Sequence, residues 1–212
     1  KTQTQELQNA DLEIAAALAE RLKLEQVLNA ALEEREAILA RAQSSFAFAA
    51  REAADGLDGI VVQEETSTVD EQELTQVRFK SREKIQFQLG SYEIANDSLV
   101  QLSLVAEDLV ELTSRLPNDL DWVIRIEGHT DQTPVNSTFS GDFRNNVQLG
   151  FLRAEAFRQA LLSTTRALGS DQLLASSFGD TSPIQDARGL SGAAKAEADQ
   201  LNRRIEFILS PR

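Results

Sequence analysis

Residues 122–131, which read WVIRIEGHTD, decide how the chain folds. Trp122, Ile124 and Ile126 place a large apolar side chain at every second position, which is the period of a β-strand with one buried face. A polar stretch, 128–145, follows this alternation directly. We therefore expect a half-buried strand that delivers Asp131 into a loop, where the backbone turns freely from Gly128 onward.

Helical and extended patterns alternate on both sides of this strand. Capping residue types at 96–98 precede an apolar helical repeat that reaches Leu112. A second helix is predicted from about Asn146 to Leu168, with Gly169 as its C-terminal cap. Further strands are predicted at 85–89, 173–178 and 205–209, and a loop at 179–192. Such an alternation is typical of α+β and α/β folds, in which helices cover one or both faces of a sheet.

The first 43 residues contain no Gly and no Pro and are rich in good helix formers. Apolar residues recur at helical spacing, at Ile14, Ala17, Leu18, Leu24, Leu28, Ala31, Leu32, Ile38 and Leu39. An isolated helix of this kind is marginal in water, so the stripe needs a partner. We favour a parallel coiled-coil homodimer, although Arg21 and Arg35 interrupt the apolar stripe. The alternative is a helix that lies on its own domain or forms a solvated stalk.

The following residues, 44–75, change character. The helix extends to about Phe48 in this interpretation, and Gly56 and Gly59 break it. Residues 60–62 suggest a short strand, and the acidic run 63–73 is typical of a solvated linker. The sequence thus predicts a helical stalk at 1–43, a linker with short elements at 44–75, and a folded domain at 76–212.

Composition excludes several classes of function. The net charge of −13 argues against binding nucleic acid, because that requires a basic patch. The chain has no Cys, which removes thiolate chemistry and the usual zinc sites. No apolar run approaches the roughly 18–20 residues that cross a bilayer. We expect any membrane anchor to precede Lys1.

Polar residues cluster at the ends of three predicted elements, at 127–131, 146–153 and 202–204. Loops at strand ends are where such sheets usually place ligand sites. If the strand and the second helix pack side by side, Asp131 and Arg153 can face each other across a pocket. That pair suits a zwitterion, because the carboxylate holds an ammonium and the guanidinium holds a carboxylate. A structural Asp–Arg salt bridge is the alternative.

These blocks, Gly128-His129-Thr130-Asp131, Asn146-x-x-Leu149-x-x-x-Arg153-Ala154 and Asn202-Arg203-Arg204-Ile205, resemble the OmpA-like peptidoglycan-binding family. The resemblance covers roughly 85–209. It implies a βαβαβ sandwich, a mixed sheet with helices packed on one face, preceded by the long N-terminal helix. The segment 133–135 and the coiled coil with its acidic linker resemble the MotB branch of that family.

The resemblance implies non-covalent binding of peptidoglycan through the diaminopimelate of its stem peptide. Asp131 would receive the ammonium and Arg153 the carboxylate, with Asn146 and Thr130 near the same pocket. Arg204 would support the site or the fold. The stretch Phe87-x-x-Gly90-Ser91 resembles the family's Phe-x-x-Gly-Ser loop, which lies close by.

The same resemblance implies the periplasmic part of an inner-membrane-anchored protein of a Gram-negative-type bacterium. A MotB-like stator subunit with a membrane ion-channel partner is one possibility, and a Pal-like envelope-tethering lipoprotein is the alternative. We expect no enzyme activity, no cofactor and no metal. A peptidoglycan hydrolase that uses Asp131 and His129 is a remote third hypothesis, because the sequence has no nucleophile elbow.

One departure from the family pattern stands out. Gly150 lies inside the predicted second helix, where it costs about 1 kcal/mol relative to Ala. The sequence offers no reason for it.

Overall fold

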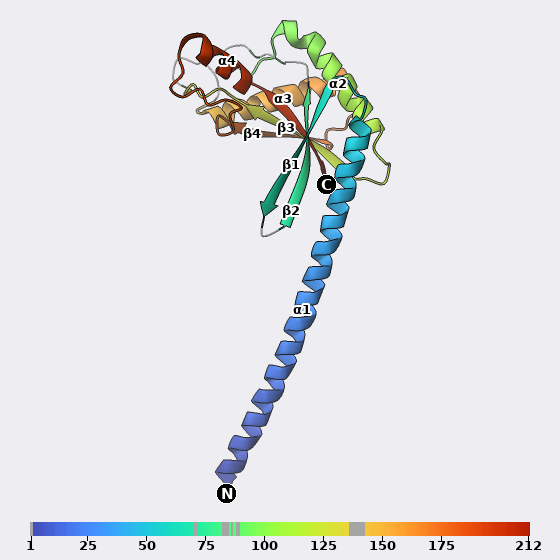
Figure 1. The fold of residues 1–212 in the computed structure, drawn as a ribbon, viewed down its shortest axis with the longest axis vertical. Coiled ribbons are helices and arrows are strands. Elements are labelled where there is room, and N and C mark those ends of the chain that lie inside the picture. The colour runs from blue at the N-terminus through green and yellow to red at the C-terminus, as the bar shows by residue number, and fades with distance from the viewer. Residues whose placement is uncertain (1, 70–71, 82–84, 86, 88–89, 136–142) are drawn as a thin grey trace. The chain divides into compact units, whose positions relative to one another are not determined.

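A computed structural model describes residues 2–69, 72–81, 85, 87, 90–135 and 143–212. The chain divides into two compact units, Lys1–Gln43 and Ser44–Arg212. Helix α1 (Thr2–Ala54) provides the first unit and, with residues 44–54, the start of the second (Figure 1). Among the helices in the described ranges, none combines the length and the apolar character that a membrane span requires.

The second unit is built on a five-stranded mixed sheet. Its strands are β1 (Ile60–Val69), β2 (Gln72–Ser81), β3 (Trp122–His129), β4 (Leu173–Gly179) and β5 (Ile205–Pro211). They lie in the order β1-β2-β5-β3-β4, and only the β3–β4 pair is parallel. The helical elements are η1 (Asn96–Ser98), α2 (Leu99–Ser114), α3 (Asn146–Thr164) and α4 (Gly192–Asn202).

The hydrophobic core lies on one face of this sheet. Ile124 and Ile126 of β3 point into it, as the alternation along this strand predicts, and Phe207 of β5 does the same. Helices α2 and α3 cover this face. Phe157 of α3 packs its ring 5.5 Å from that of Phe207. The predicted α+β class, a mixed sheet with helices preceded by a long helix, is confirmed.

The segment 44–75, predicted as a linker, is instead folded. Phe46, Ala50 and Ala53 of α1 are buried in the core, and residues 60–69 pair with β2 as a regular antiparallel hairpin. Arg115 at the end of α2 donates hydrogen bonds to the carbonyl oxygens of Ala53 and Asp55. The acidic run misleads because a hairpin is held by backbone hydrogen bonds, which the side-chain pattern does not reveal.

The predicted strand at 85–89 is not found in the described part of that stretch. Ile85 lies in the core, while Phe87 forms a single antiparallel bridge with Ile94, and residues 86, 88 and 89 lie outside the described residues. The sheet uses β2 in its place, with Val77 and Phe79 buried in the core.

Two helix boundaries also differ from the prediction. Helix α3 ends at Thr164, four residues before the expected end, and the amide of Thr165 closes it on the carbonyl of Leu161. Gly169 is therefore no helix cap, and its φ angle is not positive. Helix α4 was not predicted at all, because its eleven residues carry too few apolar positions to reveal a helical period.

Candidate functional site

Close backbone packing brings the end of β3 against α3. A Cβ atom on Gly128 would lie 1.9 Å from the carbonyl oxygen of Gly150, and one on Gly150 would lie 2.8 Å from the oxygen of Gly128. Gly128 thus belongs to the strand and permits a close approach, instead of starting a free turn as expected. The same contact explains Gly150, because a residue with a Cβ atom at this position would keep α3 from packing closely on β3. The close packing offsets the low helix propensity of Gly.

A second contact ties the loop after β3 to the first turn of α3. A Cβ atom on Gly179, whose φ is +54°, would lie 2.7 Å from the amide nitrogen of Val147. The amide of Thr130 donates a 2.9 Å hydrogen bond to the carbonyl of Gly179. The side chain of Asn146 then donates a 3.1 Å bond to the carbonyl of Thr133. These contacts hold Asp131 beside the start of α3.

Asp131 is fixed and ionised in this loop. Its Oδ1 accepts a 2.9 Å hydrogen bond from the amide of Thr133, and its Oδ2 accepts a 2.8 Å bond from Nη1 of Arg203. Burial alone would raise the pKa of Asp131. The hydrogen bonds from Arg203 and Thr133 outweigh that effect and hold the pKa below its ordinary value of 3.8.

Arg153 projects from α3 and is 2% exposed. Its Nε donates a 3.0 Å hydrogen bond to the carbonyl of Ser91, and its guanidinium lies 5.2 Å from the ring centroid of Phe87. Burial lowers the pKa of Arg153 to about 10; the charge of Asp131 opposes the shift, and that of Arg203 adds to it. Arg153 therefore stays charged at neutral pH, and the charges of Asp131 and Arg203 both influence its pKa.

Asp131 and Arg153 do not form a direct pair. Within the described part of the chain, no ion pair joins them, and only the Nε of Arg153 has a protein acceptor. Its two terminal amino groups have no acceptor among the described residues. Asp131 does form a structural salt bridge, as in the alternative interpretation, but with Arg203 and not with Arg153.

The other expected site residues divide into two groups. Asn146 and Thr130 lie at the site: both are buried, and the Thr130 hydroxyl donates to the carbonyl of Asp131. Arg204 lies elsewhere, because its Nε donates to Glu206 and its Nη2 to the carbonyl of Ser182. Adjacent residues of an extended chain point in opposite directions, so Arg203 faces Asp131 and Arg204 does not. The Asn-Arg-Arg motif contains Arg203, but only the strand register distinguishes it from Arg204.

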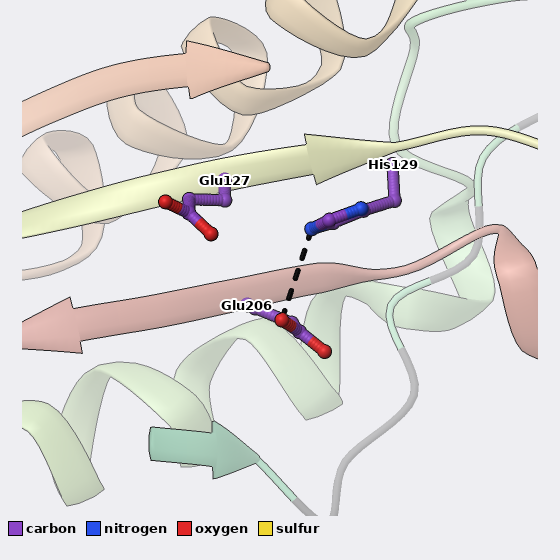
Figure 2. A group of neighbouring side chains, drawn as sticks. All are labelled: Glu127, His129 and Glu206. Atoms are coloured by element: carbon purple, nitrogen blue, oxygen red, sulfur yellow. Dashed lines mark ion pairs between the residues drawn. The ribbon is translucent and has the colours of Figure 1, made fainter. Parts of the chain in front are cut away.

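A second polar cluster, formed by Glu127, His129 and Glu206, lies on the sheet face opposite the core. Figure 2 shows the side chains of Glu127 and His129 on β3 and that of Glu206 on the neighbouring strand β5. Candidate ligand atoms of all three lie within 4.8 Å of one another, so the group resembles a metal site. The imidazole Nε2 of His129 lies 3.7 Å from Oε2 of Glu206.

Arginine side chains occupy this cluster. Nη1 of Arg78 lies 2.6 Å from Oε2 of Glu127 and 2.9 Å from Oε2 of Glu206. The remaining oxygens are bound by Arg125, 2.8 Å from Glu127 Oε1, and by Arg204, 2.8 Å from Glu206 Oε1. A cation would have to displace these guanidinium groups. The arrangement is that of a buried ion-pair network that joins three strands of the sheet.

The sequence profile of the OmpA family matches residues 86–197, more than half of the chain. The chain belongs to the OmpA family. Asp131 and Arg153 lie within the matched segment of this OmpA-family domain, whereas Arg203 lies just beyond it. Members of the family are structural proteins that bind peptidoglycan in the cell envelope, and the OmpA-family domain described here has this general role.

Solved structures of MotB-type proteins share the fold. The periplasmic domain of Helicobacter pylori MotB is 23% identical, with a TM-score of 0.51 over 75% of this chain and 83% of its own. A putative MotB-like protein from Desulfovibrio vulgaris is 20% identical, with a TM-score of 0.51 over 84% of this chain and 96% of its own. No curated protein matches the sequence.

Proposed function

We propose that the second unit binds peptidoglycan non-covalently through the diaminopimelate of its stem peptide, and thereby anchors a membrane protein or complex to the cell wall. The observation that carries this proposal is the placement of Asp131 and Arg153. They are two opposite charges on neighbouring elements, because Asn146 at the start of α3 binds the loop that carries Asp131, and α3 also carries Arg153. Such a site suits the amino-acid head group of diaminopimelate and needs no cofactor.

Each residue has a role in this proposal. A carboxylate has about four acceptor positions. Asp131 accepts from Arg203 and from the backbone and side chain of Thr133, which leaves one position for the ammonium of the ligand. The terminal amino groups of Arg153 receive the ligand carboxylate. Asn146 and Thr130 hold the loop that carries Asp131.

The test is co-sedimentation of the chain with purified peptidoglycan sacculi. Asp131→Asn and Arg153→Met should each weaken binding at least tenfold, because loss of a charge-assisted hydrogen bond removes about 1.5–3 kcal/mol. Asp119→Asn and Arg166→Met remove the same charges from exposed positions and serve as matched controls. Binding by the two site variants equal to that of their controls would refute the assignment.

The first unit supplies a second part of the proposal, a parallel homodimer. Its apolar side chains are exposed along α1, with Ile14 at 58%, Leu24 at 64% and Leu28 at 59% exposure. A second copy would bury this stripe. Two linked peptidoglycan-binding domains then gain avidity of roughly 10²–10⁴-fold over one, provided that both reach the wall.

Sedimentation measures this pairing directly. The parent chain should sediment as a dimer at micromolar concentration and Leu28→Asp as a monomer. Exposed Ser163→Asp, in the second unit, carries the same added charge as a control. A parent chain that remains monomeric throughout the accessible concentration range would remove dimerisation from the proposal.

We propose the periplasm of a Gram-negative-type bacterium as the location, in a protein anchored in the inner membrane. The motor and tether alternatives differ in the kind of membrane anchor that each requires. A transmembrane helix would favour a stator-type subunit with an ion-channel partner, and a lipidated cysteine would favour a Pal-like tether.

A further inference from the structure

Arg203 is the most accessible positive charge at the site. Its side chain is 32% exposed, whereas Arg153 as a residue is only 2% exposed. Arg203 uses a single N–H group to bind Oδ2 of Asp131, which leaves most of its five donors unused within the described structure. A ligand that reaches Asp131 therefore meets a second guanidinium as well as that of Arg153.

The balance of charge at the site follows from these three residues. Asp131 contributes one negative charge, and Arg153 and Arg203 contribute two positive ones, so the site carries an excess of one positive charge. The influence of Arg203 reaches Arg153, because its charge opposes protonation of Arg153. A ligand that binds Asp131 through an ammonium is favoured in this field when it also brings a negative charge to the two guanidinium groups.

Free and amidated head groups differ in this respect. A head group with a free carboxylate is neutral overall and supplies the negative charge. The corresponding carboxamide leaves the head group positively charged, and it keeps one acceptor oxygen but replaces the other by an NH₂ group, which cannot accept from a guanidinium. Unpaired donors at such a site are the strongest source of discrimination between close analogues.

We propose that Arg203 is a specificity-determining residue, which makes the site select diaminopimelate with a free side-chain carboxylate and reject its carboxamide. This inference rests on the proposed peptidoglycan function and names the chemical form of the ligand. Arg203 and Arg153 together bind the carboxylate, while Asp131 binds the ammonium and keeps Arg203 in place.

Calorimetry with two synthetic stem peptides tests the inference on the full chain. The peptides are identical except that one carries a free carboxylate on diaminopimelate and the other a carboxamide. The parent should bind the free acid roughly 10- to 150-fold more tightly, the range expected for a charge-assisted hydrogen bond. Arg203→Gln should reduce this ratio by about tenfold.

Two further variants separate a role in specificity from a role in folding. Arg166→Gln removes an exposed guanidinium beyond the C-terminal end of α3 and should keep the parent ratio. Arg203→Lys keeps the positive charge and should give an intermediate ratio, and it decides the question if Arg203→Gln does not fold. A structural role alone would lower the affinity for both peptides equally and leave their ratio unchanged.

The outcomes are distinguishable. A ratio near one in the parent, or a parent-like ratio in both Arg203 variants, would overturn the role of Arg203 while Asp131-dependent binding upheld the proposed function. Failure of the parent to bind either peptide would overturn the diaminopimelate proposal, and the inference about Arg203 with it.

Discussion

The contact between Gly128 and Gly150 sets how closely α3 approaches the sheet, and Gly128→Ala tests it. The added methyl carbon would lie 1.9 Å from the carbonyl oxygen of Gly150, whereas ordinary van der Waals contact begins at 3.4 Å. Strand and helix would therefore have to separate by about 1.5 Å (3.4 − 1.9). The obstructing atom belongs to the backbone, so no rotamer change relieves the clash.

The expected cost follows from two contributions. Overpacking of a well-packed interior costs typically 1–3 kcal/mol, and the backbone clash places Gly128→Ala at the upper end. Separation would also break the 3.2 Å hydrogen bond from the Ser177 hydroxyl to the carbonyl of Gly128, worth about 1 kcal/mol. Reduced freedom of the unfolded chain returns about 0.4–1 kcal/mol. The net loss in the free energy of unfolding should be about 3 kcal/mol.

Fluorescence of Trp122 measures this loss selectively. It is the only tryptophan in the chain and lies on β3, so its signal in a urea titration reports the second unit without interference from the first. A free-energy loss of this size lowers the melting temperature by roughly 2–4 °C per kcal/mol in a domain of this size. Peptidoglycan affinity should fall as well, because α3 carries Arg153.

Gly150→Ala provides the matched comparison. Its methyl group would lie 2.3 Å from the Ser177 hydroxyl oxygen and 2.8 Å from the Gly128 carbonyl oxygen, and better helix propensity offsets about 1 kcal/mol of the clash. The loss should thus be smaller, and Ser177→Ala should recover part of it in a double-mutant cycle. Unfolding of Gly128→Ala within about 0.5 kcal/mol of the parent would show that the close approach does not constrain the fold.

Three further predictions concern charged residues. Glu127→Ala should lower the free energy of unfolding by about 3–5 kcal/mol, since it removes a fully buried carboxylate that binds both Arg78 and Arg125. Exposed Glu111→Ala should cost less than about 1 kcal/mol, and urea titration measures both losses. The pKa of Asp131 is depressed, so its ionised form stabilises the fold above its unfolded pKa. The stability difference between parent and Asp131→Asn should therefore be constant from about pH 5 to 7 and shrink below about pH 4, as measured by urea titrations across that range. Arg153→Met should change the free energy of unfolding by less than about 1–2 kcal/mol by the same assay, because relief of desolvation offsets the lost hydrogen bond, and a larger loss would make Arg153 structural.

Sequence periodicity predicted the elements that carry a long, one-sided apolar pattern. The strand around Ile124 and the helix that contains Leu109 were recognised because each buries one face against the same core. The hairpin at 60–81 was missed because it is held by backbone hydrogen bonds across an acidic stretch. Helix α4 was missed because it is short and mostly polar.

The site divides along the same line. The motifs predicted Asp131, Arg153, Asn146 and Thr130 as site residues, and the fold holds the loop of Asp131 and Thr130 against the start of α3 at Asn146. They did not identify Arg203 as the partner of Asp131, nor did they separate it from Arg204. That distinction depends on the register of β5 against β3, in which Glu127 lies opposite Glu206.

The sequence by itself thus determined the family and the helical first unit, and it proposed the residue types of the site, because these depend on local patterns along the chain. The tertiary structure alone decided which charges meet. Strand order and the glycine contacts at Gly128, Gly150 and Gly179 place α3 against the sheet. Ion pairing depends on distances of a few ångströms between residues far apart in sequence, and only close packing sets those distances.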